Sequence, residues 1–331
     1  MLAIVAVAAC GQSGARLVTT SPTPLAAVQP AASPSPTPAP SHVFVVVMEN
    51  RSYEQALAGG YTAQLAAKYA VATNYHGVSH PSLPNYLAMT SGSTWGITDD
   101  GYHALPASGL GQQLTQAGIS WRAYMEGMSR TCFSSPYPYA LKHNPFPYYG
   151  GKCPAEVVPF SSFAADMADA NAPRFVWISP GLCNDGHDCS TGVADRYLSQ
   201  LVPAIMATAA WQENGVLFIT WDEGYDSANH VLTLVIRPGG EHQESSAYHD
   251  HYSLLATIED RLGVPRLGQA AKTSSLRELL VSGSASQPRS SPGASPWSTS
   301  SPRAAAPRPR SLRARVPWAR AAGLLAGRKA R

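Results

Sequence analysis

What this chain of 331 residues has little of limits its function first. The apolar runs at its two ends, Met1–Ala9 and 321–327, are shorter than the roughly 20 residues of a membrane-spanning helix. Its five cysteines include no Cys-x-x-Cys pair, which disfavours a structural zinc cluster. We therefore expect neither a membrane span in these runs nor a zinc finger.

Acidic residues are absent from 281–331, a segment that holds ten of the 24 lysines and arginines. The preceding residues therefore carry 14 basic and all 21 acidic side chains, a net charge of −7 against +3 for the whole chain. Nucleic-acid binding depends on clustered positive charge, so no nucleic-acid partner is expected for the core. The Ser, Pro, Ala and Arg composition of 281–331 is typical of a disordered basic tail.

The first 41 residues have the composition of an export signal followed by a tether. Residues 1–10 resemble the end of a signal peptide, and Val7-Ala8-Ala9-Cys10 resembles a bacterial lipobox, in which the cysteine is lipidated and associates with the membrane. Ordinary signal cleavage is the alternative. Residues 11–41 contain seven prolines between Ser21 and Pro40 and are typical of an extended linker. We expect an exported chain, either secreted or a cell-surface lipoprotein, with its globular domain at 42–280.

The other four cysteines agree with export, because disulfides persist in oxidising compartments. They are Cys132, Cys153, Cys183 and Cys189. Three pairings are open from sequence alone, and closeness along the chain favours Cys132–Cys153 and Cys183–Cys189. A zinc site is the competing interpretation of the same four residues.

Two apolar runs each end in a pair of side chains with oxygen ligands. Val43–Met48 is followed by Glu49 and Asn50, and 216–221 is followed by Asp222 and Glu223. Short runs rich in β-branched and aromatic residues predict strands buried on both faces. Ligands of open α/β sheets lie at the carboxyl ends of the strands, and carboxylate and amide oxygens suit a divalent metal ion. The alternative is that each pair starts a solvated loop or caps a helix.

Strands and helices alternate through the rest of the domain. Helices are expected at 61–69, 109–117, 162–170, 193–201 and 248–262, with Pro203 interrupting or restarting the fourth. Further strands are expected at 119–125, 174–179 and 230–236. This alternation predicts an α/β fold, a three-layer α/β/α sandwich with a mainly parallel sheet.

Two further segments carry candidate functional residues. The run from His80 to Tyr86 (HPSLPNY) places the Ser82 hydroxyl at the start of a predicted helix, where unpaired N–H groups favour anions. A plain N-cap is the commoner role of such a serine. Residues 129–159, rich in Tyr, Pro and Gly, are too long for an ordinary connection and predict an ordered, substrate-facing insertion.

Five short runs in order resemble one known family. They are MENRSY from Met48, HPSLPNY from His80, 142–146 (KHNPF), WDEG from Trp221 and HYSLL from His251. Over 42–280 the chain resembles the phosphoesterase family that includes secreted bacterial and fungal acid phosphatases and zinc-independent phospholipases C. That family belongs to the alkaline phosphatase-like superfamily, whose fold agrees with the expected sandwich.

The resemblance implies roles for nine residues. The metal ligands would be Glu49, Asn50, Asp222 and Glu223. Ser82 would be the nucleophile and Asn85 would hold a phosphate oxygen, with His143, His187 and His251 around the phosphate. The pattern departs from the superfamily at Glu223, where a histidine is common, so the identity and number of the metal ions stay open. Tyr86 stands where a sulfatase needs arginine, which disfavours a sulfatase.

The function implied is hydrolysis of phosphate monoesters through a phosphoserine intermediate. Ser82 would attack phosphorus with help from the metal ion, and His187 or His251 would protonate the leaving oxygen. The substrate would be a phosphate ester, with phosphatidylinositol 3-phosphate and other phospholipids among the candidates. Two alternatives stay open: a phospholipase C-type phosphodiesterase, and a surface binding lipoprotein without activity.

Overall fold

The computed structural model describes residues 42–129, 131–134, 136–168 and 172–281. The expected signal and lipobox at 1–10, with Cys10, and the linker at 11–41 lie outside the described residues. The basic tail lies outside them as well, apart from Val281. In the part of the chain described, no helix combines the length and apolar character needed to cross a lipid bilayer.

Eight strands form one sheet in the order β5-β4-β6-β1-β7-β8-β2-β9. All neighbouring pairs are parallel except those made by β8, which runs antiparallel to both β7 and β2. A separate parallel pair joins β10 to β3. The strands are β1 (His42–Met48), β2 (Ala70–Ala72), β3 (Tyr75–His76), β4 (Trp121–Met125), β5 (Val157–Pro159), β6 (Phe175–Ser179), β7 (Gly215–Trp221), β8 (Thr233–Ile236), β9 (Gln243–Ser245) and β10 (His249–Asp250).

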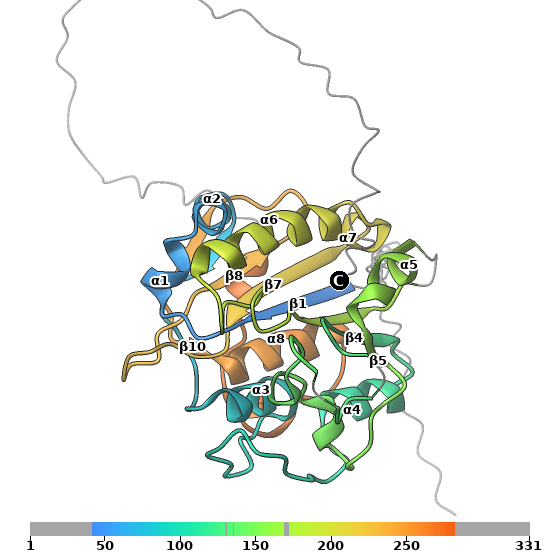
Figure 1. The fold of residues 1–331 in the computed structure, drawn as a ribbon. Coiled ribbons are helices and arrows are strands. Elements are labelled where there is room, and N and C mark those ends of the chain that lie inside the picture. Colours follow the sequence, from blue (N-terminus) through green and yellow to red (C-terminus); the bar gives the residue numbers. More distant parts are fainter. Residues whose placement is uncertain (1–41, 130, 135, 169–171, 282–331) are drawn as a thin grey trace, which may run out of the picture. The chain divides into compact units, whose positions relative to one another are not determined.

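Helices cover both faces of the sheet, which confirms the three-layer sandwich. Figure 1 shows α2, α6 and α7 on one face and α3, α4 and α8 on the other. The α-helices are α1 (Tyr53–Leu57), α2 (Gly60–Lys68), α3 (Ser82–Ser91), α4 (Leu110–Gln116), α5 (Phe163–Ala168), α6 (Thr191–Met206), α7 (Ala209–Gln212) and α8 (His251–Leu262). Short 3-10 helices are η1 (Leu141–His143), η2 (Phe146–Tyr148), η3 (Phe160–Ser162), η4 (Gly268–Lys272) and η5 (Arg277–Leu280).

The two strands that carry the oxygen pairs are neighbours at the centre of the sheet. Strand β1 pairs with β7 in parallel register over its whole length, from His42 opposite Gly215 to Met48 opposite Trp221. Both strands are fully buried apart from His42, as their continuous apolar runs predict. Because the two strands end level with each other, the side chains that follow them meet at one edge of the sheet.

The prediction for Pro203 is wrong. Proline 203 was expected to interrupt or restart a helix, but α6 runs unbroken from Thr191 to Met206 through it. Proline 203 lies in the last turn and is exposed, so only one backbone hydrogen bond is lost and water can reach that face.

The insertion at 129–159 is held by short 3-10 helices and by a disulfide. Cys132 pairs with Cys153, and Cys183 pairs with Cys189, six positions further along the chain. Both pairings are the ones that closeness along the chain favours. Because all four cysteines are in disulfides, they cannot bind zinc. The second disulfide closes the loop that follows β6, at the same edge of the sheet as the ends of β1 and β7.

Candidate active site

Ser82 is the first residue of α3 and is fully buried. Its Oγ lies 3.2 Å from Glu49 Oε2 and 3.3 Å from Glu223 Oε1, so its proton can be donated to either carboxylate. The same Oγ lies 3.5 Å from the Asn50 side-chain oxygen. The structure therefore brings the predicted nucleophile against three of the four predicted metal ligands, and its oxygen is not used as a helix cap.

Asn50 and Asp222 complete a cluster of oxygens. The backbone N–H of Asn50 donates to Asp222 Oδ1 at 3.0 Å. The side-chain oxygen of Asn50 faces Glu49 Oε2 and Asp222 Oδ1, each at 3.2 Å. Oxygens that face one another repel unless the amide turns so that its nitrogen donates, or unless a cation lies among them. Asp222 Oδ2 is also buried without a hydrogen-bond partner among the described residues.

Burial and mutual repulsion oppose ionisation of this cluster. Burial, followed by the negative charges of Glu49 and Glu223, raises the pKa of Asp222 well above its usual value. Burial also raises the pKa of Glu223, although the contact with His80 opposes it. A cation bound among these oxygens would remove the repulsion. Carboxylate and amide oxygens are the hard ligands that divalent ions prefer, so the residues present fit a metal ion.

Glu49 is held on its other side by His143 and Tyr86. The Tyr86 hydroxyl donates to Glu49 Oε1, and the Tyr86 ring stacks on His143 with centroids 5.3 Å apart. His143 forms ion pairs with Glu49 Oε2 at 3.1 Å and with Asp185 Oδ2 at 3.3 Å. Burial alone would lower the pKa of His143, but the two carboxylates raise it to about 10. Burial raises the pKa of Glu49 and the positive charge of His143 more than offsets this, so the net pKa is lowered.

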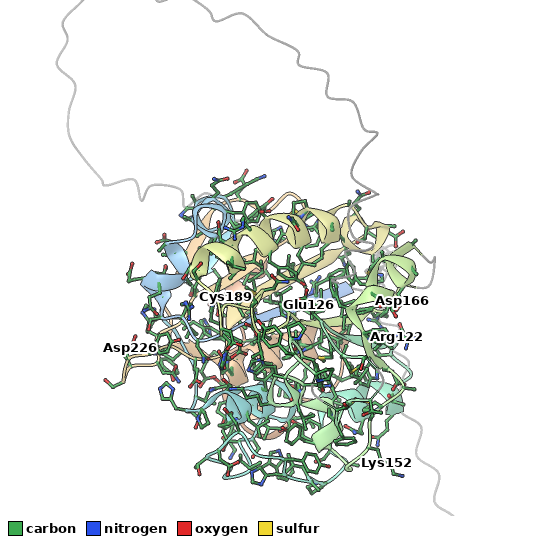
Figure 2. All side chains as sticks on the ribbon, viewed as in Figure 1. Arg122, Glu126, Lys152, Asp166, Cys189 and Asp226 are labelled. Carbon is green, nitrogen blue, oxygen red and sulfur yellow. A yellow bond between two sulfur atoms is a disulfide. The ribbon has the colours of Figure 1, made fainter. Side chains whose placement is uncertain are left out.

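Glu49, His143 and Asp185 form a second possible metal-binding group. One ligand atom from each lies within 4.8 Å of the others, and all three residues are buried. Asp185 follows β6 in the loop closed by the disulfide of Cys183. Glu126, labelled in Figure 2, supports this loop by accepting from the Gly181 N–H at 2.7 Å.

His187 lies at the site as predicted, and its contacts define its tautomer. Its Nδ1 lies 2.7 Å from Asp188 Oδ1 and its Nε2 lies 3.2 Å from Lys142 Nζ. Because the lysine ammonium can only donate, Nε2 accepts and Nδ1 carries the proton. In this arrangement His187 has no proton on the nitrogen that faces Lys142.

Two predicted catalytic residues have other partners in the structure. The Asn85 side chain accepts from the Val78 and Ser79 N–H groups and donates to the carbonyls of Ser79 and Pro81. Both of its N–H donors are thus used within the loop that precedes Ser82. Asn85 therefore positions this loop and does not offer a donor to a substrate.

His251 lies beneath the site and not in it. It is fully buried, with Nε2 2.5 Å from the Asp222 carbonyl and Nδ1 3.1 Å from the Tyr75 hydroxyl. Burial lowers its pKa to about 4, so it is neutral at the pH of most assays. His251 therefore fixes the backbone of Asp222, and a role as proton donor to the substrate does not fit this geometry.

Sequence reasoning missed five residues at the site: His80, Tyr86, Asp100, Lys142 and Asp185. Two of them had a local signal, because Tyr86 lies one helical turn after Ser82 and His80 lies two residues before it. The Asp100 and Lys142 side chains pair at 2.9 Å across 42 positions, a contact that no local pattern encodes.

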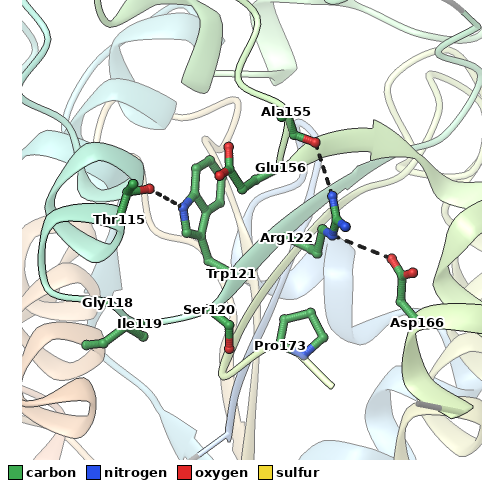
Figure 3. A pocket seen from close by; sticks show the side chains of 10 residues that line it. All are labelled: Thr115, Gly118, Ile119, Ser120, Trp121, Arg122, Ala155, Glu156, Asp166 and Pro173. Atoms are coloured by element: carbon green, nitrogen blue, oxygen red, sulfur yellow. Dashed lines mark hydrogen bonds and ion pairs between the residues drawn. The ribbon is translucent and has the colours of Figure 1, made fainter. Parts of the chain in front are cut away.

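One cleft is remote from this cluster. It has a volume of about 570 Å³ and is lined by residues that include Trp121, Arg122, Glu156 and Asp166 (Figure 3). Trp121 and Arg122 begin β4 and Glu156 precedes β5, so the cleft lies at the amino ends of these parallel strands, opposite the edge where Glu49 and Asp222 meet. Arg122 is already bonded to the Ala155 carbonyl and paired with Asp166. This cleft is therefore not the candidate active site.

Comparison with families of known sequences finds one match. A model described as the Phosphoesterase family matches residues 58–265. The matched span contains Ser82, His143, His187, Asp222 and His251, and it begins after the Glu49-Asn50 pair.

Curated proteins and solved structures are also similar to the chain. The phosphate-repressible acid phosphatase of Penicillium chrysogenum is 28% identical over 244 residues, which cover 67% of this chain and 59% of that protein. The phosphatidylinositol-3-phosphatase of Mycobacterium tuberculosis is 32% identical over 257 residues, which cover 72% and 82%. This chain thus spans less than two thirds of the length of the acid phosphatase.

One solved structure is that of a protein in the alkaline phosphatase superfamily from Vibrio parahaemolyticus. It matches with a TM-score of 0.53 at 10% identity and covers 73% of this chain and 72% of that one. At this level of identity the likeness concerns the fold, which agrees with the mainly parallel sandwich.

Proposed function

The chain belongs to the phosphoesterase family, and from that premise we propose that it is a phosphatase that hydrolyses phosphate monoesters through Ser82. The observation that supports this most strongly is the position of the Ser82 hydroxyl. It lies at the start of α3, within 3.3 Å of oxygens of Glu49 and Glu223. A hydroxyl so placed can lose its proton to a carboxylate as it attacks an electrophile.

A divalent cation is part of the proposal. Glu49, Asn50, Asp222 and Glu223 would hold it, and the buried, unpartnered Asp222 Oδ2 and the carboxylates around Ser82 support this assignment. When bound, the ion would make the Ser82 hydroxyl a stronger nucleophile and would polarise the phosphoryl group. Glu49, His143 and Asp185 are the alternative ligand set, so the identity and number of the ions are left open.

The reaction proceeds in two steps at Ser82. In the first, Oγ forms a bond to phosphorus while the bond to the leaving oxygen breaks; the hydroxyl proton passes to Glu49 or Glu223, and the alkoxide takes up a proton from solvent to leave as the alcohol. In the second, water attacks the phosphoserine and gives up one proton to solvent, the bond from phosphorus to Oγ breaks, inorganic phosphate leaves, and Ser82 regains its proton from the carboxylate. Tyr86 and His143 hold Glu49 in place throughout, because they contact its two carboxylate oxygens.

We propose phosphoinositides as one substrate class. The relative from Mycobacterium tuberculosis is named a phosphatidylinositol-3-phosphatase, which supports a lipid monoester. Tyr102 and Phe133 are half-exposed and pack edge to face with centroids 5.4 Å apart. Tyr102 lies two residues after Asp100, whose carboxylate accepts from the Leu83 N–H beside the nucleophile. These rings could contact an apolar leaving group.

We propose that the chain works outside the cytosol, as a secreted protein or a lipoprotein anchored at Cys10. Two disulfides in the described part of the chain support this, because such bonds persist in oxidising compartments. The domain limits of 42–280 are part of the same proposal.

The direct test is hydrolysis of p-nitrophenyl phosphate by the full chain across pH, with and without EDTA. We expect activity that EDTA removes and a divalent ion restores. Ser82→Ala should lower kcat by at least about 1,000-fold without lowering the melting temperature, because the nucleophile is lost and the fold is kept. Full activity in this variant would exclude Ser82 as nucleophile. No hydrolysis by the natural chain under any metal would favour the diesterase or the inactive binding protein.

A further inference from the structure

We infer that Lys142 binds the phosphoryl group of the substrate and makes the enzyme prefer monoesters, which carry two negative charges, over diesters, which carry one. The inference rests on the proposed function, because it concerns the choice of substrate at Ser82. Lysine 142 lies in η1 of the insertion, next to His143.

A closed ring of contacts places Lys142 beside the nucleophile. From Ser82 Oγ the ring passes to Glu49 at 3.2 Å and from Glu49 to His143 at 3.1 Å. The rings of His143 and His187 lie 5.6 Å apart. His187 Nε2 contacts Lys142 Nζ at 3.2 Å.

The other half of the ring returns to the backbone of α3. Lys142 Nζ donates to Asp100 Oδ2 at 2.9 Å, and Asp100 Oδ1 accepts from the Leu83 N–H at 3.0 Å. Leu83 follows Ser82, so the ring closes on the nucleophile's own neighbour. Lys142 is therefore linked to the start of α3, where Ser82 lies, through the single side chain of Asp100.

The ammonium group of Lys142 is fixed but not fully used. It has three N–H donors, and its contacts in the described structure direct two of them at Asp100 and His187. The third is left for a phosphoryl oxygen. The Lys142 side chain is 21% exposed, so its head is accessible to a ligand and is partly shielded from solvent.

The charge of Lys142 matters because the site is otherwise rich in carboxylates. Glu49 and Glu223 contact Ser82, and Asp222 accepts from the N–H of Asn50, which follows Glu49. These groups repel an anionic substrate, and they repel the dianion of a monoester more than the monoanion of a diester. The ammonium group of Lys142 offsets the second charge, and a charge-assisted hydrogen bond is stronger than a neutral one.

The competing interpretation is that Lys142 only holds Asp100 on the Leu83 N–H. Loss of such a structural contact would disturb Ser82 itself, so both classes of ester would be affected equally. Loss of a phosphoryl-binding charge affects the monoester selectively. The ratio of the two activities therefore separates the two roles, and it does not depend on what fraction of a variant is folded.

The experiment measures kcat/KM of the full chain for p-nitrophenyl phosphate and for bis-p-nitrophenyl phosphate, with the same metal ion. For Lys142→Gln we expect a loss of about 100-fold on the monoester and less than about 5-fold on the diester. Lys142→Arg should keep most of the monoester preference, because the positive charge is retained. Lys152→Gln is the matched control, an exposed lysine of the same insertion that is labelled in Figure 2, and should change neither value.

Equal losses on both esters in Lys142→Gln, or no loss on either, would overturn the inference. Lys142→Met, which keeps the apolar stem, is the second variant if the glutamine variant does not fold. Failure of the proposed function would give a different result, because the unaltered chain would then hydrolyse neither ester with any divalent ion. In that case the inference about Lys142 would be wrong as well.

Discussion

Glu259 is a buried carboxyl group far along the chain from the candidate site. It lies in α8, and its Oε1 accepts from the Leu267 N–H at 2.8 Å. Its Oε2 is buried without a hydrogen-bond partner among the described residues. Burial raises its pKa from 4.5 to about 8, although the Leu267 N–H and the charge of Arg266 oppose the shift.

This raised pKa predicts a pH-dependent stability. A carboxyl whose folded pKa exceeds its unfolded pKa binds a proton more tightly in the folded state, so its contribution to stability is lost as pH rises from about 4.5 to 8. Glu259→Gln removes the titration and keeps the acceptor for Leu267. We expect the variant to gain about 3 kcal/mol relative to the natural chain between pH 5 and pH 8.

Urea unfolding at the two pH values measures the difference. Comparison with the natural chain at each pH cancels the titration of the other buried carboxyl groups. A difference in unfolding free energy that is the same at pH 5 and pH 8 would show that Glu259 does not titrate in this range.

Helix α2 depends on a side chain from α6 for its amino-terminal cap. Asp195 of α6 accepts from the Tyr61 N–H at 2.9 Å, and from the N–H and hydroxyl of Thr62 at 2.7 and 2.8 Å. The cap residue of α2 itself is Gly59, which has no side chain to offer. A Cβ at Gly59 would lie 2.5 Å from Asp195 Oδ1, so the close approach of the two helices requires glycine there.

We expect Asp195→Ala to destabilise the protein by about 1–2 kcal/mol, because three donors at the start of α2 lose their acceptor. Urea unfolding with an unchanged m-value is the measurement. Glu241→Ala, an exposed loop carboxylate, is the control and should leave the unfolding free energy within about 0.5 kcal/mol. A loss below that size in Asp195→Ala would show that water replaces the cap.

At the scale of the whole molecule, acidic side chains lie together at one edge of the sheet. Glu49, Asp185 and Asp222 follow β1, β6 and β7, which are neighbours in the sheet and run parallel. Folding therefore brings together carboxylates that are far apart in the unfolded chain. Their repulsion lowers the free energy of unfolding, and a bound cation would remove this repulsion. Metal binding and folding should therefore be coupled.

Addition of a divalent ion to the EDTA-treated chain should raise the melting temperature. At a concentration 100 times the dissociation constant, ligand binding adds about 2.7 kcal/mol to the unfolding free energy. Asp222→Asn should lose most of this gain, whereas Asp188→Asn, which changes a half-exposed carboxylate outside the cluster, should keep it. If magnesium, calcium, manganese and zinc ions all leave the melting temperature unchanged, the proposed metal site is wrong.

Much of the fold follows from local patterns. The fully buried strands β1 and β7 were predicted from continuous apolar runs, and the alternation of strands and helices predicted the sandwich. The disulfides were predicted from closeness in sequence. Pro203 was misjudged because a local rule could not show that the last turn of α6 is exposed.

The sequence alone determined which side chains could act at the site, whereas the tertiary structure decided which of them meet. Glu49, Ser82 and Asp222 were found because each lies at an element end, where local pattern and sheet geometry coincide. His251 and Asn85 match the residue types of the family. However, His251 bonds to the backbone of Asp222, and Asn85 bonds to the backbone of the 78–81 loop. Lys142 reaches Ser82 only through Asp100, His187 and His143. Such contacts join residues about 40 positions apart, and no period of the local chain specifies them.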